Sequence, residues 1–184
     1  MSYITKDLLT EIIEENIPFL NEYEFQFAVA MAIKEHNPDL KVKIEQNIYC
    51  DKEQENCRCD IVALNKNEEE VLFVELKYVI TFGAQSDKTS MGARMSFVSD
   101  IKRLYDLKDK YPLAEKYCVF VTNKKAVFDN TIKCNYFNEN YAKKELWTPV
   151  SFSKSKNFQN VDNVHFLIIN AKEAGADIPD DYKY

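Results

Sequence analysis

A chain of 184 residues, 46% of them hydrophobic and 29% charged, is long enough to bury the core of one globular domain. Its first residues lack the basic start and apolar core of a signal peptide and no apolar run can span a bilayer, so we expect a cytoplasmic protein without a membrane anchor. The net charge of −6 argues against a general polyanion binder, but residues 1–75 hold seven basic and seventeen acidic side chains, and residues 76–184 hold seventeen and thirteen.

The cysteines and histidines do not form the pattern of a metal site. Five cysteines are scattered over the chain as an odd set without a CxxC pair, which indicates neither a disulfide framework nor a zinc cluster. The two histidines, His36 and His165, are far from each other and from the cysteines. We therefore expect partly buried thiols rather than zinc ligands.

Two helices are predicted at the start of the chain. Thr5 can cap the first, in which apolar residues at positions 8, 9, 12 and 13 form one stripe. The second covers residues 21–36, with Asn21 as its N-cap and the sequence His-Asn-Pro at its end. Because this helix is apolar on most sides, we expect it to be well buried.

Three strands are predicted next, over residues 40–50, 57–64 and 71–82. The first shows the alternation of a half-buried strand, and the other two are apolar runs. The polar segments DKEQEN and NKNEEE separate them. Since both segments are short, the three strands can form a meander.

The rest of the chain completes an α/β pattern. Residues 116–123 are typical of a strand buried on both faces, whereas residues 126–160 give no clear pattern. The order of elements implies a mixed central sheet of about four to five strands flanked by helices. The other expected segments are a loop at 83–93, a helix at 94–111, a strand at 164–171 and a loose acidic tail at 175–184.

Charged side chains interrupt two of the predicted strands. Glu75 and Lys77 share one face of the third strand, and Asp60 lies in the apolar second strand. If the two strands pair as a hairpin, two carboxylates and one ammonium converge. The carboxylates repel each other, and a hard divalent cation with oxygen ligands resolves that repulsion. A lysine beside such a cation suits metal-assisted phosphodiester hydrolysis.

Asp60, followed after fourteen residues by Glu75-Leu76-Lys77, resembles the D…(D/E)xK signature of the PD-(D/E)XK nuclease superfamily. The resemblance implies a restriction-endonuclease-like fold and a metal-dependent endonuclease, with DNA as the expected substrate. It also implies that Asp60, Glu75 and the backbone carbonyl of Leu76 bind Mg²⁺ or Mn²⁺, while Lys77 acts on the attacking water. The proline of the signature is absent here, with Cys59 before Asp60.

The resemblance covers about residues 20–122, from the second helix through the fourth strand. We therefore expect a single nuclease-like domain over residues 1–184, with residues 123–184 as a C-terminal extension that adds a further strand. Many relatives act as dimers, so a homodimer or larger assembly is possible, although no sequence pattern marks a dimer face.

Glu24 is the counterpart of the helix-borne acidic residue of the superfamily, which reaches the metal through water, and Glu22 is the weaker candidate. A second interpretation needs no chemistry, because Asn21 and Glu24 have the spacing of a capping box. The charges in the strands have a similar alternative, a cross-strand salt bridge on a solvated face.

Basic residues after the Lys77 strand can neutralise a nucleic-acid backbone, since residues 84–125 hold nine basic and five acidic side chains. The alternatives are that the lysines of this helix form only its solvated side, and that Asp100 and Arg103 form a local ion pair. Ser96, Asp100 and Arg103 can instead face the site, as a helix here does in the resembling fold. The candidates for phosphate contact are Lys88, Arg94, Lys102, Arg103, Lys124 and Lys125.

A different class of function stays open, a non-catalytic interaction protein that retains the nuclease fold. The acidic net charge and the short chain favour it, whereas the intact Asp60, Glu75 and Lys77 favour the enzyme. Motifs of hydrolase elbows, P-loops and dinucleotide-binding folds do not occur.

Overall fold

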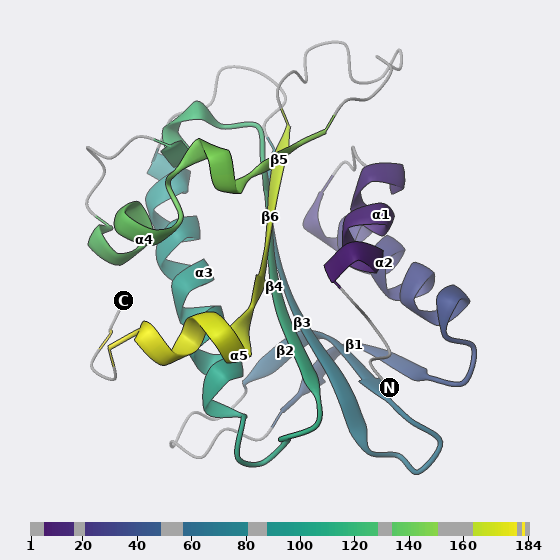
Figure 1. The fold of residues 1–184 in the computed structure, drawn as a ribbon. Helices are drawn as coiled ribbons and strands as arrows, with labels where there is room; N and C mark the ends of the chain where they lie inside the picture. The colour runs from purple at the N-terminus through teal and green to yellow at the C-terminus, as the bar shows by residue number, and fades with distance from the viewer. Residues whose placement is uncertain are drawn as a thin grey trace.

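The computed structural model describes residues 6–16, 21–48, 57–80, 88–128, 134–150 and 164–179 together with residue 182. For residues 16 and 88–90 it describes the backbone but not the side chain. A mixed sheet in the order β1-β2-β3-β4-β6-β5 forms the centre, and helices cover both of its faces (Figure 1). The predicted α/β class and the mixed, helix-flanked sheet are confirmed.

The strands of this sheet are β1 Lys41–Asn47, β2 Arg58–Leu64, β3 Glu70–Val79, β4 Glu115–Thr122, β5 Thr148–Pro149 and β6 His165–Asn170. The α-helices are α1 Lys6–Asn16, α2 Glu22–His36, α3 Lys88–Asp106, α4 Asn135–Asn140 and α5 Ala171–Ala174. Short 3₁₀ helices are η1 Lys125–Phe128, η2 Lys144–Leu146 and η3 Gly175–Asp177.

The predicted meander is present, because β1 pairs with β2 and β2 pairs with β3, both antiparallel. Helix α3 then crosses over so that β4 lies parallel to β3, and β6 returns antiparallel to β4. The described sheet has six strands rather than four to five. The two-residue β5 lies in the stretch where the sequence shows no strand pattern.

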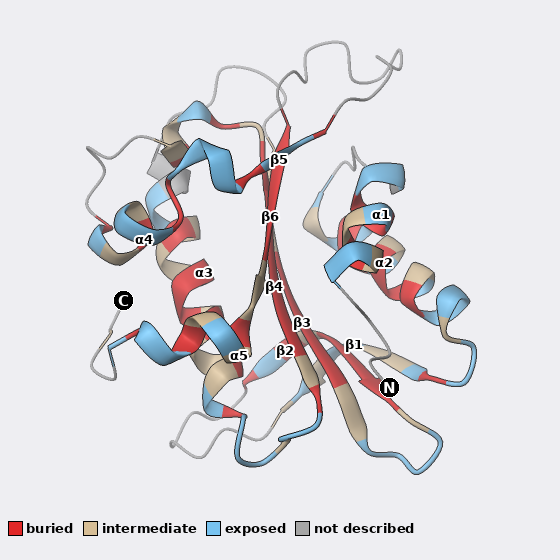
Figure 2. Ribbon diagram, viewed as in Figure 1, coloured by how far each residue is buried: buried red, intermediate tan, exposed pale blue. Residues whose placement is uncertain are grey.

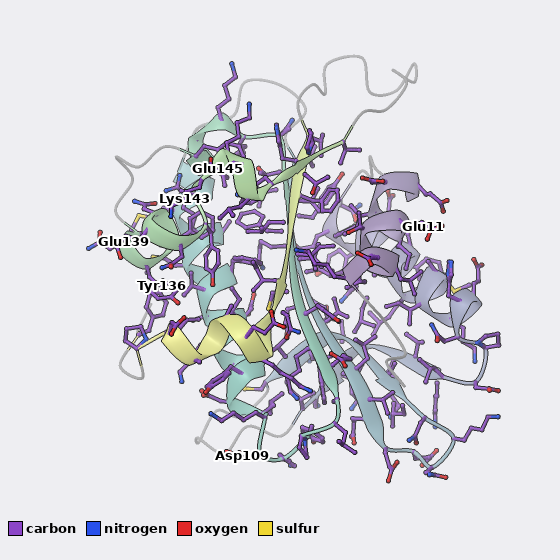
Figure 3. All side chains as sticks on the ribbon, in the orientation of Figure 1. Glu11, Asp109, Tyr136, Glu139, Lys143 and Glu145 are labelled. Carbon is purple, nitrogen blue, oxygen red and sulfur yellow. The ribbon has the colours of Figure 1, made fainter. Side chains whose placement is uncertain are left out.

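Two separate cores lie on the two faces of the sheet. Helices α1 and α2 pack on one face around Phe25 and Ile33, and α3, α4 and α5 pack on the other around Phe97 and Phe120 (Figure 1). The central strands are buried along most of their length, while the outer sides of the helices are exposed (Figure 2). Charged side chains such as Glu139 on α4 point outward from this second layer (Figure 3).

The boundaries of α3 differ from the prediction. It begins at Lys88 rather than 94, because Gly92 lies within the helix although glycine is typical of a loop. It ends at Asp106 rather than 111, where the chain turns with a hydrogen bond from Lys108 N–H to the Tyr105 carbonyl. The first three residues of the predicted loose tail form η3, and Gly175 packs so closely on Tyr105 that a Cβ atom there would overlap that side chain.

Helix α2 begins as predicted, since the Asn21 side chain accepts a hydrogen bond from Glu24 N–H at 2.9 Å. The expectation that α2 is well buried is wrong for one of its sides. Tyr23, Phe27 and Met31 are 75%, 59% and 44% exposed. They lie one turn apart and form an apolar stripe that no described residue covers.

Candidate functional site

The sheet opens between β2 and β3, and the candidate site lies in that opening. Strand β2 stays paired with β1 as far as Arg58, but its described pairing with β3 ends at Ile61 opposite Val74. Strand β3 continues beside β4 to Val79. Beyond Val74, the backbone groups of β3 on the β2 side therefore need partners other than a strand.

Two carboxylates supply those partners. Asp60 Oδ2 accepts a hydrogen bond from Leu76 N–H at 2.6 Å, and Glu22 Oε2 accepts one from Tyr78 N–H at 2.8 Å. Extending the β2–β3 register by one residue sets Asp60 opposite Glu75, but the Asp60 carboxylate turns into the gap between the strands. Charge-assisted bonds to backbone amides hold both carboxylates in place.

Gln26 is a site residue that the sequence analysis did not single out. It is 4% exposed on α2, and its Nε2 donates to the backbone carbonyl of Asp60 and to Glu45 Oε1, each at 3.0 Å. Glu45 has a positive φ of 52°, an uncommon backbone conformation for a residue with a Cβ atom. It lies opposite Asp60, so Gln26 ties together the irregular positions of β1 and β2. The feature of the sequence that could have identified Gln26 is its amide side chain, which interrupts the apolar face of the helix.

Glu75 is the deepest carboxylate of the site. Its side chain is 5% exposed, and Arg103 Nη2 of α3 lies 2.6 Å from Oε1. The same Nη2 contacts Asp100 Oδ1 at 3.0 Å. Glu75 Oε1 and Arg103 Nε are buried without a hydrogen bond, so the short contact is an ion pair that lacks hydrogen-bond geometry. The local Asp100–Arg103 pair expected from the sequence is present, and it faces the site.

Lys77 lies two residues beyond Glu75 on β3 and is half-buried. Its positive charge lowers the pKa of both Asp60 and Asp100, which places it among the carboxylates. Its ammonium makes no hydrogen bond or ion pair with any residue in the described part of the chain. The structure therefore brings together the predicted Asp60, Glu75 and Lys77.

Burial dominates the electrostatics of these acids. Burial raises the pKa of Asp60 to about 6, against the hydrogen bond from Leu76 N–H, which lowers it. Burial and the neighbouring Asp100 carboxylate raise the pKa of Glu75 well above its ordinary value. Among the described residues, Glu22, Asp60, Glu75 and Asp100 share the site with two cations, Lys77 and Arg103, so acidic groups outnumber basic ones at this point.

The donors at this point are oxygen atoms, the kind of ligand that a hard divalent cation such as Mg²⁺ or Mn²⁺ takes. Among the described residues, no three His, Cys, Asp or Glu side chains are grouped so as to hold a metal ion. Two carboxylates and the Leu76 carbonyl can still suffice, because Mg²⁺ commonly keeps several waters. Oxygen donors and surplus negative charge suit such an ion, although Arg103 now contacts the Glu75 oxygen.

Glu24 does not lie in this cluster. It is exposed beside Tyr23 and Phe27 on the outer side of α2, half a turn away from the side that carries Glu22 and Gln26. Its backbone N–H completes the N-cap with Asn21, as the capping alternative predicted. The helix-borne carboxylate at the site is Glu22, the weaker of the two candidates.

The proposed phosphate-contact residues are corrected in several places. Arg94 is fully buried, donates to Asn138 Oδ1 at 2.8 Å and to the Ala126 carbonyl, and lies over the Phe137 ring, so it faces the core rather than a phosphate. The same correction applies to Lys124, which is 7% exposed.

The remaining candidates divide between the site and the surface. Lys102 pairs with Asp106 at 2.9 Å on α3, but its side chain is only 16% exposed, so it does not belong to a solvated side of the helix. Arg103 contacts Glu75 and Asp100. Lys125 is exposed just after β4. The Lys88 side chain lies outside the described residues.

No helix in the described ranges has the length and apolar character needed to cross a membrane. Comparison of the chain with protein-family models, with curated proteins and with solved structures finds no match. The functional assignment therefore depends on the side chains at the opening of the sheet and on the motif that carries them.

Proposed function

We propose that this chain is a metal-dependent nuclease of the PD-(D/E)XK type, with a restriction-endonuclease-like core, that hydrolyses phosphodiester bonds, with DNA as the expected substrate. The observation that carries the proposal is the hydrogen bond between Asp60 Oδ2 and Leu76 N–H. It joins the aspartate of the motif to its Glu75-Leu76-Lys77 segment at the point where the sheet opens. A salt bridge on a solvated face would need neither this opening nor the burial of Glu75.

Asp60, Glu75 and the Leu76 carbonyl would hold the Mg²⁺ or Mn²⁺. The N–H and C=O of one residue in an extended strand point to the same edge, so the Leu76 carbonyl is expected to open on the gap that holds the Asp60 carboxylate. When bound, the cation supplies Lewis acidity toward a phosphoryl oxygen and lowers the pKa of a coordinated water.

The other side chains position these groups. Gln26 fixes the backbone of Asp60, and Glu22 fixes the Tyr78 amide next to Lys77. The Lys77 ammonium, which has no close described partner, can orient the attacking water and offset negative charge that develops on the phosphate. Burial strengthens these interactions because water screens them less.

A non-catalytic interaction protein is the second candidate, and one observation favours it. Arg103 contacts Glu75 Oε1 and Asp100 in the structure, so the deepest carboxylate already has a counter-ion. In that case the cluster stabilises the fold alone, and Lys77 serves as a further counter-ion for Asp60 and Asp100.

Lys77→Ala separates the two candidates. In a nuclease, the variant should lose about 10²- to 10⁴-fold in cleavage rate, because one electrostatic or proton-transfer group of the transition state is removed. Its melting temperature and its Mn²⁺ binding should stay close to those of the wild type. The assay uses duplex, single-stranded and branched DNA and RNA, each with Mg²⁺ or Mn²⁺.

Lys66→Ala is the matched control, because Lys66 pairs with Asp39 on the surface and both side chains are more than 70% exposed. It should cleave as fast as the wild type. Glu75→Gln should be inactive, so any cleavage by this variant would come from a contaminating nuclease. A wild type that cleaves none of these substrates, together with a Lys77→Ala variant that melts far lower, would favour the interaction protein.

A further inference from the structure

Within the described part of the chain, Arg103 is the basic side chain that makes close contact with the carboxylates of the site. It extends from α3 toward β3, and a single nitrogen, Nη2, lies 2.6 Å from Glu75 Oε1 and 3.0 Å from Asp100 Oδ1. Glu75 Oε1 belongs to a predicted metal ligand. The guanidinium and a divalent cation would therefore compete for the same carboxylate.

The geometry of this contact is poorer than an arginine and a carboxylate can achieve. A paired arginine commonly makes two parallel hydrogen bonds to one carboxylate, whereas among the described residues a single Arg103 nitrogen is shared between two acids. Arg103 Nε and Glu75 Oε1 are both buried and lack a hydrogen-bond partner. Buried polar atoms in a native protein normally have partners, so this arrangement leaves interactions unmade.

The surroundings leave Arg103 a second place to go. Its side chain is 26% exposed, whereas that of Glu75 is 5% exposed, so the guanidinium lies toward the outer part of the site. Asp100 lies one helical turn before it on the same helix and is 14% exposed. Arg103 can therefore leave Glu75 and keep its contact with Asp100, without any change in the backbone of α3.

We propose that Arg103 is a resident counter-ion of the metal site, which occupies Glu75 in the metal-free protein and must be displaced before a divalent cation can bind there. This inference rests on the proposed function, since it takes Glu75 as a metal ligand. The displacement weakens the affinity for the cation, because each binding event breaks the Arg103–Glu75 contact.

The test is a calorimetric titration of the full chain with Mn²⁺. Arg103→Gln removes the competing charge and should bind Mn²⁺ about tenfold or more tightly than the wild type. Lys102→Gln is the control, because it removes the same charge from the adjacent residue, whose ammonium pairs with Asp106 on α3. Its affinity should stay within about twofold of the wild type if general charge effects are small.

Thermal melts provide a second readout that needs no cleavage. Arg103→Gln should melt lower than the wild type in EDTA, since Glu75 and Asp100 lose their counter-ion. Saturating Mn²⁺ should then raise its melting temperature by more than it raises that of the wild type. Arg103→Lys, which keeps the charge, should have intermediate affinity and serves if the glutamine variant does not fold.

Unchanged or weaker Mn²⁺ binding by Arg103→Gln would overturn the inference, and so would an absence of binding to both proteins. The gain must also disappear in the double variant Arg103→Gln with Glu75→Gln, because otherwise the ion binds elsewhere. Tighter Mn²⁺ binding through Glu75 without any cleavage by the wild type would support the counter-ion role and defeat the nuclease proposal. If the wild type cleaves but binds Mn²⁺ as tightly as Arg103→Gln does, the nuclease proposal would be supported and the counter-ion role would be defeated.

Discussion

Lys116 and Glu75 are both buried charged residues on adjacent strands of one sheet, yet their surroundings differ in kind. Lys116 lies opposite Phe73 in the β3–β4 register, and Phe73 is two residues before Glu75 on β3. Its Nζ donates to the Tyr111 and Ala114 carbonyls at 2.6 and 3.2 Å. Neutral backbone groups therefore satisfy the cation, and no ligand is needed.

Glu75 is surrounded instead by other charges, with Asp60 and Asp100 as like-charged neighbours and Arg103 as a partner in poor geometry. Arg94 resembles Lys116, because its partners are the Asn138 amide, the Ala126 carbonyl and the Phe137 ring. Burial alone thus does not mark a functional charge. A buried charge whose neighbours carry the same sign of charge, as Asp60 and Asp100 do beside Glu75, is the better indication of a ligand site.

The largest expected effect tests the structural side of this comparison. Arg94→Ala should lower the free energy of unfolding by about 3–5 kcal/mol, because it removes a fully buried side chain and leaves its polar partners without a donor. Lys125 is exposed and precedes Ala126, whose carbonyl accepts from Arg94. Lys125→Ala should change the free energy of unfolding by less than about 0.5 kcal/mol. Urea unfolding of both variants measures the difference. Equal stabilities would show that the Arg94 contacts contribute little.

Lys116 should give a pH dependence of stability in the alkaline range. Burial lowers the pKa of Lys116 from 10.5 to about 8, so between these values the unfolded chain binds more protons than the folded one. The contribution of Lys116 to the free energy of unfolding therefore rises with pH through this window, by at most about 3 kcal/mol. Below about pH 8 this contribution does not change with pH, because Lys116 is protonated in both states.

Lys116→Met should abolish that rise, and the wild type minus the variant isolates it. The subtraction is necessary because burial raises the pKa of Tyr141 and of Cys59, and their titration makes stability fall with pH at the alkaline end. Unfolding is measured at pH 7.5, 8.5 and 9.5. If the difference in unfolding free energy between the two proteins stayed constant over these pH values, the pKa of Lys116 would not be lowered in the folded protein.

Asp60→Asn tests the opposite side of the comparison. The variant should raise the stability of the metal-free protein at neutral pH by about 1–2 kcal/mol, since an amide is cheaper to bury than a carboxylate and can still accept from Leu76 N–H. Mn²⁺ should stabilise the wild type but not the variant. Melts with EDTA and with Mn²⁺ check both points, and a destabilised variant would indicate that the carboxylate has a structural role.

The smallest expected effect separates two glutamates of one helix. Glu22→Gln keeps an acceptor for Tyr78 N–H and should change stability by less than about 1 kcal/mol while reducing cleavage. Glu24→Gln should leave both unchanged, because its side chain is exposed on the outer side of α2. Cleavage that depends on Glu24 rather than on Glu22 would contradict the site as the structure shows it.

Local patterns in the sequence were enough for much of the fold. The apolar runs at residues 57–64 and 71–82 and the cap at Asn21 concern contacts within a few residues, and the structure places β2, β3 and α2 accordingly. The spacing of Asp60, Glu75 and Lys77 also predicted one site, because a short hairpin leaves few registers.

Only the tertiary structure decided which helix residues complete the site. The choice between Glu22 and Glu24 depends on which side of α2 packs on the sheet, and the burial of Arg94 depends on η1 and α4, more than thirty residues later. Gln26 and Arg103 acquire their roles from the opening between β2 and β3, which no local pattern records. The sequence by itself determined the elements and the charged motif, since those follow from periodicity. The three-dimensional packing determined which charges have neutral partners and which lie among like charges, because burial and pairing are long-range properties.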